Sequence, residues 1–267
     1  MRFFKTQQIA AIVIVLAAVT AGGCTWLDQL SARNELNRGV QAYTNKNYAT
    51  AIEHFEQAVA KDPELVDAYL YMAISYRAQY VPQGTSSENM ERARMAIQTF
   101  EEVLAKTPDD PQRQATAMAN LAGIYSGMNN IEMAKEWYHK RLEVEPDNPE
   151  PMYGIATLDW QVAYDATGMD GEGVQELTEE QKAEIDALVD DGIAQLRQAL
   201  EINPEYADAM QYLNLLYREK AKLTEDEEEK AQWESEANEL AMQALELKRR
   251  QEAAAEEARR TVTGGEK

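Results

Sequence analysis

Few side chains in this sequence are of the types that carry acid–base catalysis or hold a metal. The two histidines, His54 and His139, stand beside aromatic residues in helix-like segments. The sequence contains no nucleophile elbow, no phosphate-binding loop and no metal-ligand spacing. We therefore expect both histidines at a surface or groove edge, and we expect a protein that is not an enzyme and uses no cofactor or metal.

Four acidic residues cluster in one glycine-rich segment, at Asp165, Asp170, Glu172 and Glu176. A calcium loop needs alternating oxygen ligands and a glycine at its sixth position. Counted from Asp165, the sixth position is Asp170, so the calcium pattern fails. A solvated acidic loop is the expectation, with an adventitious cation as the alternative.

The only cysteine, Cys24, follows an N-terminal segment with the features of an export signal. Arg2 and Lys5 precede an apolar run over residues 9–19, which is too short to span a bilayer core of about 30 Å. Small residues stand directly before Cys24. This arrangement resembles a bacterial lipoprotein signal, in which residues 1–23 are removed and the Cys24 thiol carries lipid.

The resemblance implies a lipid-anchored protein of the bacterial cell envelope, with residues 24–31 as a lipidated linker. In that class, Thr25 after the cysteine suggests delivery to the periplasmic face of the outer membrane. Two alternatives stay open: an ordinary signal peptide with Cys24 incidental, and an uncleaved anchor. A single cysteine excludes an intramolecular disulfide in each case.

The charge balance restricts the possible partners. The chain has 47 acidic and 26 basic residues and a formal net charge of −21. Phosphate backbones require a basic surface, so we expect no nucleic-acid partner. An acidic surface favours basic partners or basic patches on partners. Alanine, glutamate, leucine and glutamine are abundant, which indicates helices.

Small, aromatic and proline residues recur at fixed offsets along the chain, and the third set repeats the scheme at the unbroken 34-residue period. The three sets are Gly39, Ala51, Phe55, Ala58 and Pro63; Tyr69, Met72, Ala73, Tyr76, Ala96, Phe100 and Pro108; and Leu121, Ala122, Tyr125, Ala134, Tyr138 and Pro146. This spacing resembles the tetratricopeptide repeat (TPR), a helix hairpin that stacks on its neighbours to bury its apolar face.

The resemblance implies an all-α fold, a right-handed α-solenoid of about five TPR hairpins with elongated helices in repeats 2, 4 and 5. The solenoid would occupy residues 32–250, followed by a charged helix end and tail at 251–267. The expected repeats are about 32–65, 66–110, 115–148, 149–206 and 207–250. The aromatic residues at repeat positions are expected in the core. Capping boxes are expected at Thr85 with Glu88, Thr178 with Gln181, and Thr224 with Glu227.

In the TPR family, inner-face residues of each first helix line a concave groove that binds other chains. Carried over to this sequence, those positions are Arg33, Leu36, Val40, Tyr43, Leu70, Ile74, Arg77, Tyr153, Thr157, Trp160, Gln161, Gln211, Leu215 and Arg218. Leu36, Val40, Leu70 and Ile74 would form an apolar patch for an amphipathic helix or an extended apolar peptide. The alternative is that extra helices or the chain's own termini cover this patch.

The resulting hypothesis is a lipid-anchored TPR scaffold that binds envelope or periplasmic proteins through its groove during envelope assembly or recruitment. The alternative is an adaptor that regulates a peptidoglycan-active enzyme or a secretion or pilus complex. Family members that grip a C-terminal carboxylate use Lys and Asn on the inner face. Leu36 and Val40 occupy the corresponding sites here, so that mode is not expected.

The lipoprotein interpretation predicts that Cys24 is the only site of acylation. Metabolic labelling with a fatty acid should mark the wild-type protein and leave Cys24→Ala unmarked, because the thiol is the attachment atom. Equal labelling of the two proteins would exclude lipid attachment at Cys24.

Overall fold

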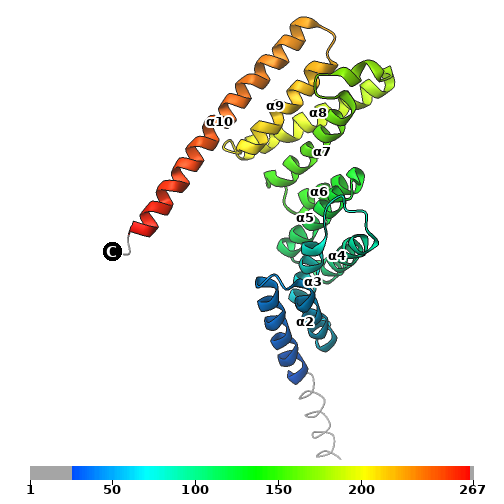
Figure 1. The fold of residues 1–267 in the computed structure, drawn as a ribbon, viewed down its shortest axis with the longest axis vertical. Coiled ribbons are helices and arrows are strands. Elements are labelled where there is room, and N and C mark those ends of the chain that lie inside the picture. Colours follow the sequence, from blue (N-terminus) through cyan, green and yellow to red (C-terminus); the bar gives the residue numbers. More distant parts are fainter. Residues whose placement is uncertain (1–25, 265–267) are drawn as a thin grey trace, which may run out of the picture. The chain divides into compact units, whose positions relative to one another are not determined.

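The computed structural model describes residues 26–264, which are helical apart from short connections (Figure 1). Residues 26–44 form the first described helix. The later elements are α2 Tyr48–Lys61, α3 Val66–Gln79, α4 Ser87–Lys106, α5 Pro111–Gly127, α6 Ile131–Val144, α7 Pro149–Thr167, the 3₁₀ helix η1 Glu172–Glu176, α8 Glu179–Ile202, α9 Ala207–Leu223 and α10 Glu227–Gly264. The expected all-α fold of stacked helix hairpins is confirmed. The signal segment and Cys24 lie outside the described residues.

The chain divides into two compact units, Met1–Asn129 and Asn130–Lys267, each described by itself. Within each unit, consecutive helices pack against one another: α2 to α5 in the first, and α6 to α10 in the second. Among residues 26–264, none of the helices combines the length and apolar character that crossing a membrane requires.

The core of the first unit forms around Phe55 on α2. Ala51, Phe55 and Ala58 are fully buried at the helical spacing the sequence indicated. A Cβ atom at Gly39 would lie 2.3 Å from Cε1 of Phe55. Glycine at position 39 therefore lets the helix of residues 26–44 approach the Phe55 ring closely.

The expectation that all the repeat-position aromatics are core residues is only partly correct. Phe55 and Phe100 are fully buried, whereas Tyr69, Tyr76, Tyr125 and Tyr138 are half-buried. Tyrosine keeps its hydroxyl near water or a polar partner, as Tyr76 does by donating to Glu56 Oε1 over 3.3 Å. Tyr125 lines a cavity of about 600 Å³ together with Met90, Ile97 and Met128.

The insertion before α4 is fixed by one buried asparagine. Asn89 donates from Nδ2 to the carbonyls of Val81 (2.9 Å) and Gly84 (2.8 Å), and its Oδ1 accepts from the Val81 N–H (2.7 Å). The capping box predicted at Thr85 is wrong by one residue, since Ser86 caps the helix by accepting from the Asn89 N–H.

The second unit contains the two longest described helices. The capping box of Thr178 and Gln181 is confirmed at the start of α8. At the start of α10, Asp226 rather than Thr224 accepts from the first free N–H groups, those of Glu228 and Glu229. Ala237, Ala244 and Leu247 are buried, after which α10 continues as an exposed charged helix past the start of α9 (Figure 1).

The close approach at Gly39 predicts opposite effects for two Gly→Ala changes in the first unit. Gly39→Ala should destabilise this unit by about 1–3 kcal/mol, because the buried Phe55 ring has no free space into which to move. Gly123→Ala should stabilise it by about 0.5–1 kcal/mol through helix propensity, since its nearest neighbour is the end of the exposed Arg77 side chain at 3.3 Å. Urea unfolding monitored by circular dichroism measures both changes, and shifts of the same sign and size would contradict the packing described.

Candidate functional site

Part of the expected inner face of the first unit is used for packing. Leu36, Val40 and Tyr43 are half-buried against the cluster that contains Phe55. The Tyr43 and Phe55 rings also contact Tyr71, with centroid distances of 6.2 and 5.9 Å. These residues therefore support the hairpin as well as facing outward.

The other expected inner-face positions of the first unit lie on α3 and at the start of the first described helix. Leu70 and Ile74 are half-buried, and Arg77 is exposed; the three share one face of α3 at i, i+4 and i+7. Arg33 is exposed on the helix of residues 26–44. Leu70 and Ile74 are thus the apolar positions of this face that lie outside the Phe55 cluster.

The second unit brings together five aromatic side chains from α7, from α9 and from the residue that precedes α9, and we call them the aromatic surface: Tyr153, Trp160, Tyr164, Tyr206 and Tyr212. Tyr212 meets both Tyr153 (5.3 Å between centroids, 90°) and Trp160 (5.5 Å, 87°) in edge-to-face contacts. Tyr206 lies 5.3 Å from Tyr153, and Tyr164 stacks on Trp160 at 5.1 Å. All five residues are half-buried, and Tyr153, Trp160, Tyr206 and Tyr212 also pack against the core of the second unit.

Sequence reasoning identified Tyr153 and Trp160 but missed their three aromatic partners. It placed Gln211 on the inner face of α9, yet the Gln211 Oε1 atom accepts from Lys248 Nζ of α10 over 2.8 Å. The next residue, Tyr212, faces α7 instead. One residue rotates a helical position by about 100°, so Tyr212 and not Gln211 joins the aromatic surface.

The hydroxyls of Tyr153 and Tyr206 are neutral at ordinary pH. Burial raises the pKa of Tyr206 to about 12, with the nearby carboxylates of Glu150 and Asp208 adding to the shift. Burial also raises the pKa of Tyr153. Tyr153 and Tyr206 therefore offer uncharged hydroxyl groups, which can donate and accept hydrogen bonds.

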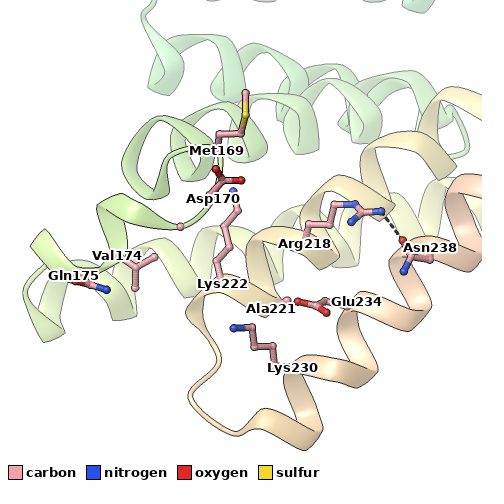
Figure 2. A pocket seen from close by; sticks show the side chains of 11 residues that line it. Met169, Asp170, Val174, Gln175, Arg218, Ala221, Lys222, Lys230, Glu234 and Asn238 are labelled. Atoms are coloured by element: carbon pink, nitrogen blue, oxygen red, sulfur yellow. Dashed lines mark hydrogen bonds between the residues drawn. The ribbon is translucent and has the colours of Figure 1, made fainter.

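Arg218, expected in the same groove, lies instead in a separate cavity of about 560 Å³ (Figure 2). Its Nη2 atom donates to Asn238 Oδ1 over 2.8 Å. The cavity lies between the loop after α7, α9 and the start of α10, and its lining residues are Met169, Asp170, Gly171, Val174, Gln175, Arg218, Ala221, Lys222, Lys230, Glu234 and Asn238. Its lining combines three basic with two acidic side chains.

The loop that borders this cavity is tied to α9 by Lys222. The Lys222 ammonium donates to the Gly168 carbonyl (2.7 Å) and to both carboxylate oxygens of Glu219 (2.8 and 3.0 Å). Glu219 is buried and also accepts from the Thr167 hydroxyl at 2.6 Å. The charge of Lys222 is thereby paired with Glu219, and its contact with Gly168 holds the loop against α9.

The acidic residues expected in one loop are all exposed, but Asp165 lies in the last turn of α7, and Glu172 and Glu176 lie in η1, which leaves Asp170 in the loop. The Glu172 carboxylate accepts from the Asp170 N–H over 2.9 Å, and backbone N–H groups lower its pKa. No group of three His, Cys, Asp or Glu side chains suited to a metal is found among the described residues.

The two histidines occupy different environments. His54 Nδ1 lies 2.9 Å from Glu35 Oε2, and Lys61 donates to Glu35 Oε1 over 3.0 Å. The Lys61 ammonium, followed by His54, lowers the pKa of the buried Glu35. His139 is exposed on α6. His54 thus helps to pair a carboxylate that joins two helices.

A second buried ion cluster joins α6, α7 and α8. Lys135 donates to Asp159 Oδ1 (2.7 Å) and to Asp191 Oδ2 (3.0 Å). Asp159 is fully buried, and burial raises its pKa to about 6 although Lys135 opposes the shift. The second oxygen of Asp159, Oδ2, has no hydrogen-bond partner. One ammonium group therefore donates to two carboxylates, and it provides the hydrogen bond of the fully buried Asp159.

Comparison with known proteins agrees with this fold. Residues 115–148, which form α5 and α6, match the tetratricopeptide repeat family. Stress-induced-phosphoprotein 1 of Caenorhabditis elegans is 26% identical over 128 residues, which cover 48% of this chain and 37% of that protein. The match therefore spans well under half of that relative's length.

Two solved structures share the fold at low sequence identity. MamA 41-end from Desulfovibrio magneticus RS-1 aligns with a TM-score of 0.54 at 14% identity, covering 83% of this chain and 97% of that one. A crystal structure of MamA aligns with a TM-score of 0.53 at 16% identity, covering 80% and 96%. Residues 115–148 thus match a tetratricopeptide repeat, and the chain shares its fold with these two MamA structures.

The Lys135 cluster predicts a pH-dependent stability defect. Lys135→Met should cost about 3–5 kcal/mol at pH 7, because it leaves the Asp159 carboxylate buried without an ammonium. Asp191→Asn should cost about 1 kcal/mol or less, because Asp191 is part-exposed and the Lys135–Asp159 pair remains. Urea unfolding of both variants at several pH values tests this difference.

The sign of the pH effect follows from the raised pKa of Asp159. A carboxyl group whose pKa rises from 3.8 to about 6 on folding contributes stability that is full below 3.8 and is lost as the pH rises through 6. Without Lys135 the stability should fall more between pH 5 and pH 7 than it does in the wild type. The difference in the free energy of unfolding between the wild type and Lys135→Met should therefore be smaller at pH 5 than at pH 7. A deficit that stays constant over this range would argue against a buried, unpaired Asp159.

Proposed function

We propose that this protein is a lipid-anchored scaffold of the bacterial cell envelope that binds partner proteins through the inner faces of its helix hairpins. The observation that carries the binding role is the aromatic surface on α7 and α9. Five part-exposed rings hold one another in place there by edge-to-face, tilted and stacked contacts. Tyrosine and tryptophan dominate the energetics of protein interfaces, because they bury a large area at small entropic cost.

The surroundings of the aromatic surface indicate the chemistry of the partner. The carboxylates of Glu150 and Asp208 lie close enough to influence the pKa of Tyr206. A partner segment that combines apolar side chains with lysine or arginine would bury the former on the rings and place the latter near these acids. The net charge of −21 would also speed the approach of such a basic segment.

The anchoring role is supported by the sequence of residues 1–24, in which an apolar run precedes a single cysteine. Lipid on Cys24 would hold the scaffold at a membrane, with the outer membrane favoured by Thr25. Acyl chains contribute about 0.8 kcal/mol for each buried CH₂ group, so two or more chains on one residue anchor a protein stably.

The binding role predicts that loss of two rings abolishes partner capture. In the full-length protein, Tyr153→Ser with Tyr212→Ser should reduce cross-linked partner recovery from envelope extracts about thirtyfold or more, because losing one interface hot spot costs about 2 kcal/mol. Circular dichroism melting of the same variant shows whether the fold is retained.

A second variant, Leu70→Ser with Ile74→Ser, tests the apolar face of the first unit. These two side chains are chosen because Leu36 and Val40 also pack against the Phe55 cluster. Loss of capture in this variant alone would assign partner binding to the first unit. Full capture by both folded variants would contradict groove binding altogether.

A further inference from the structure

The first turns of the first described helix expose three large apolar side chains. Trp26, Leu27 and Leu30 are 62%, 58% and 54% exposed. They begin two residues after Cys24, which lies outside the described residues. Exposed tryptophan and leucine this close together are costly in water, so they indicate an environment that covers them.

These three side chains lie opposite the face of the helix that packs on α2. The packed face carries Ala32, Glu35 and Gly39, which are buried. At about 100° per residue, positions 26, 27 and 30 fall on the other side of the helix. They are therefore not positions that the hairpin itself can bury.

The same outward side carries positive charge and no acid. Beyond Leu30 its side chains are Arg33, Asn34, Asn37, Arg38 and Gln41, all exposed. Arg38 forms an ion pair with Glu35 at 3.7 Å, although its own side chain is 56% exposed. The two acids of this helix, the exposed Asp28 and the buried Glu35, stand seven residues apart and so lie on the opposite side of the helix. In a chain of net charge −21, an acid-free side with two arginines is distinctive.

We infer that this outward side lies on the lipid surface of the membrane. Trp26, Leu27 and Leu30 would enter the boundary between headgroups and acyl chains, where tryptophan is enriched, and Arg33 and Arg38 would face anionic headgroups. The inference rests on the proposed lipid anchor, which would deliver the helix to the bilayer. Position supports lipid over a protein occupant, because the exposed residues follow the lipidation site directly.

The arrangement also orients the first hairpin. A lipid chain on Cys24 alone would not fix the orientation of the protein relative to the membrane, whereas an apolar and basic helix side adds a second attachment. Two weak membrane signals together bind far more firmly than one. The acidic remainder of the surface would be repelled by anionic lipid, which leaves the outward side of this helix as the favoured contact.

Photo-crosslinking in the full-length protein tests the inference. Benzoylphenylalanine replaces Leu30 in one protein and Leu245 in another; these two helical leucines are matched, with exposures of 54% and 51%. Membranes from cells that produce each protein are illuminated, and peptides that contain the probe are searched for phospholipid adducts by mass spectrometry. We expect about tenfold more lipid adduct at position 30, because lipid-surface contact is confined to the N-terminal helix.

Equal lipid adduct at the two positions, or an adduct at position 30 that is a protein chain, would overturn the inference. Fatty-acid labelling of Cys24 in the same samples separates this outcome from failure of the anchor. Labelled Cys24 without lipid adduct at position 30 removes the inference and keeps the anchor. If lipid adduct forms at position 30 but Cys24 carries no fatty-acid label, the contact between this helix and the lipid surface is supported, and acylation of Cys24 is not its cause.

Discussion

Close approach of helices at glycine is the constraint on which both units depend. A Cβ at Gly39 would lie 2.3 Å from the Phe55 ring, and one at Gly154 would lie 2.5 Å from the Tyr138 ring. At Gly192 the nearest atoms belong to Leu216 and Asp159. At each of the three positions a bulky side chain of one helix sits on the bare backbone of another, so the helices pack closely without voids.

This packing determines which side chains remain available for binding. Gly154 faces Tyr138 and is buried, so its neighbour Tyr153 is directed to a different side of α7 and reaches Tyr206 and Tyr212. The aromatic surface is therefore held by the helix backbone and by ring contacts. Its side chains lose little conformational entropy on binding, which is the advantage of a preorganised site.

The positions of the helices could be predicted from the sequence, whereas the capping residues and the side chains that meet on a surface could be predicted less well. Proline and the small-residue spacing marked helix ends and packed faces because those effects are local. Caps were displaced where Ser86 and Asp226 competed with a nearby threonine, and only the fold shows which oxygen reaches a free N–H. Tyr212 and the Lys135 cluster depend on partners far away in sequence, which no local pattern reveals.

The buried ion clusters suit a repeat protein whose helices have similar apolar faces. An apolar stripe alone tolerates slippage between neighbouring hairpins, but Lys135 can satisfy Asp159 and Asp191 together only when α6, α7 and α8 are in one register. Glu35 with His54 and Lys61 imposes the same kind of requirement between the helix of residues 26–44 and α2, and the contacts of Glu219 with Thr167 and of Lys222 with Gly168 fix α9 against the end of α7. Such pairs add little net stability, since desolvation offsets their attraction. Their contribution here is to the choice of register, and a fixed register is what places the aromatic surface on α7 and α9.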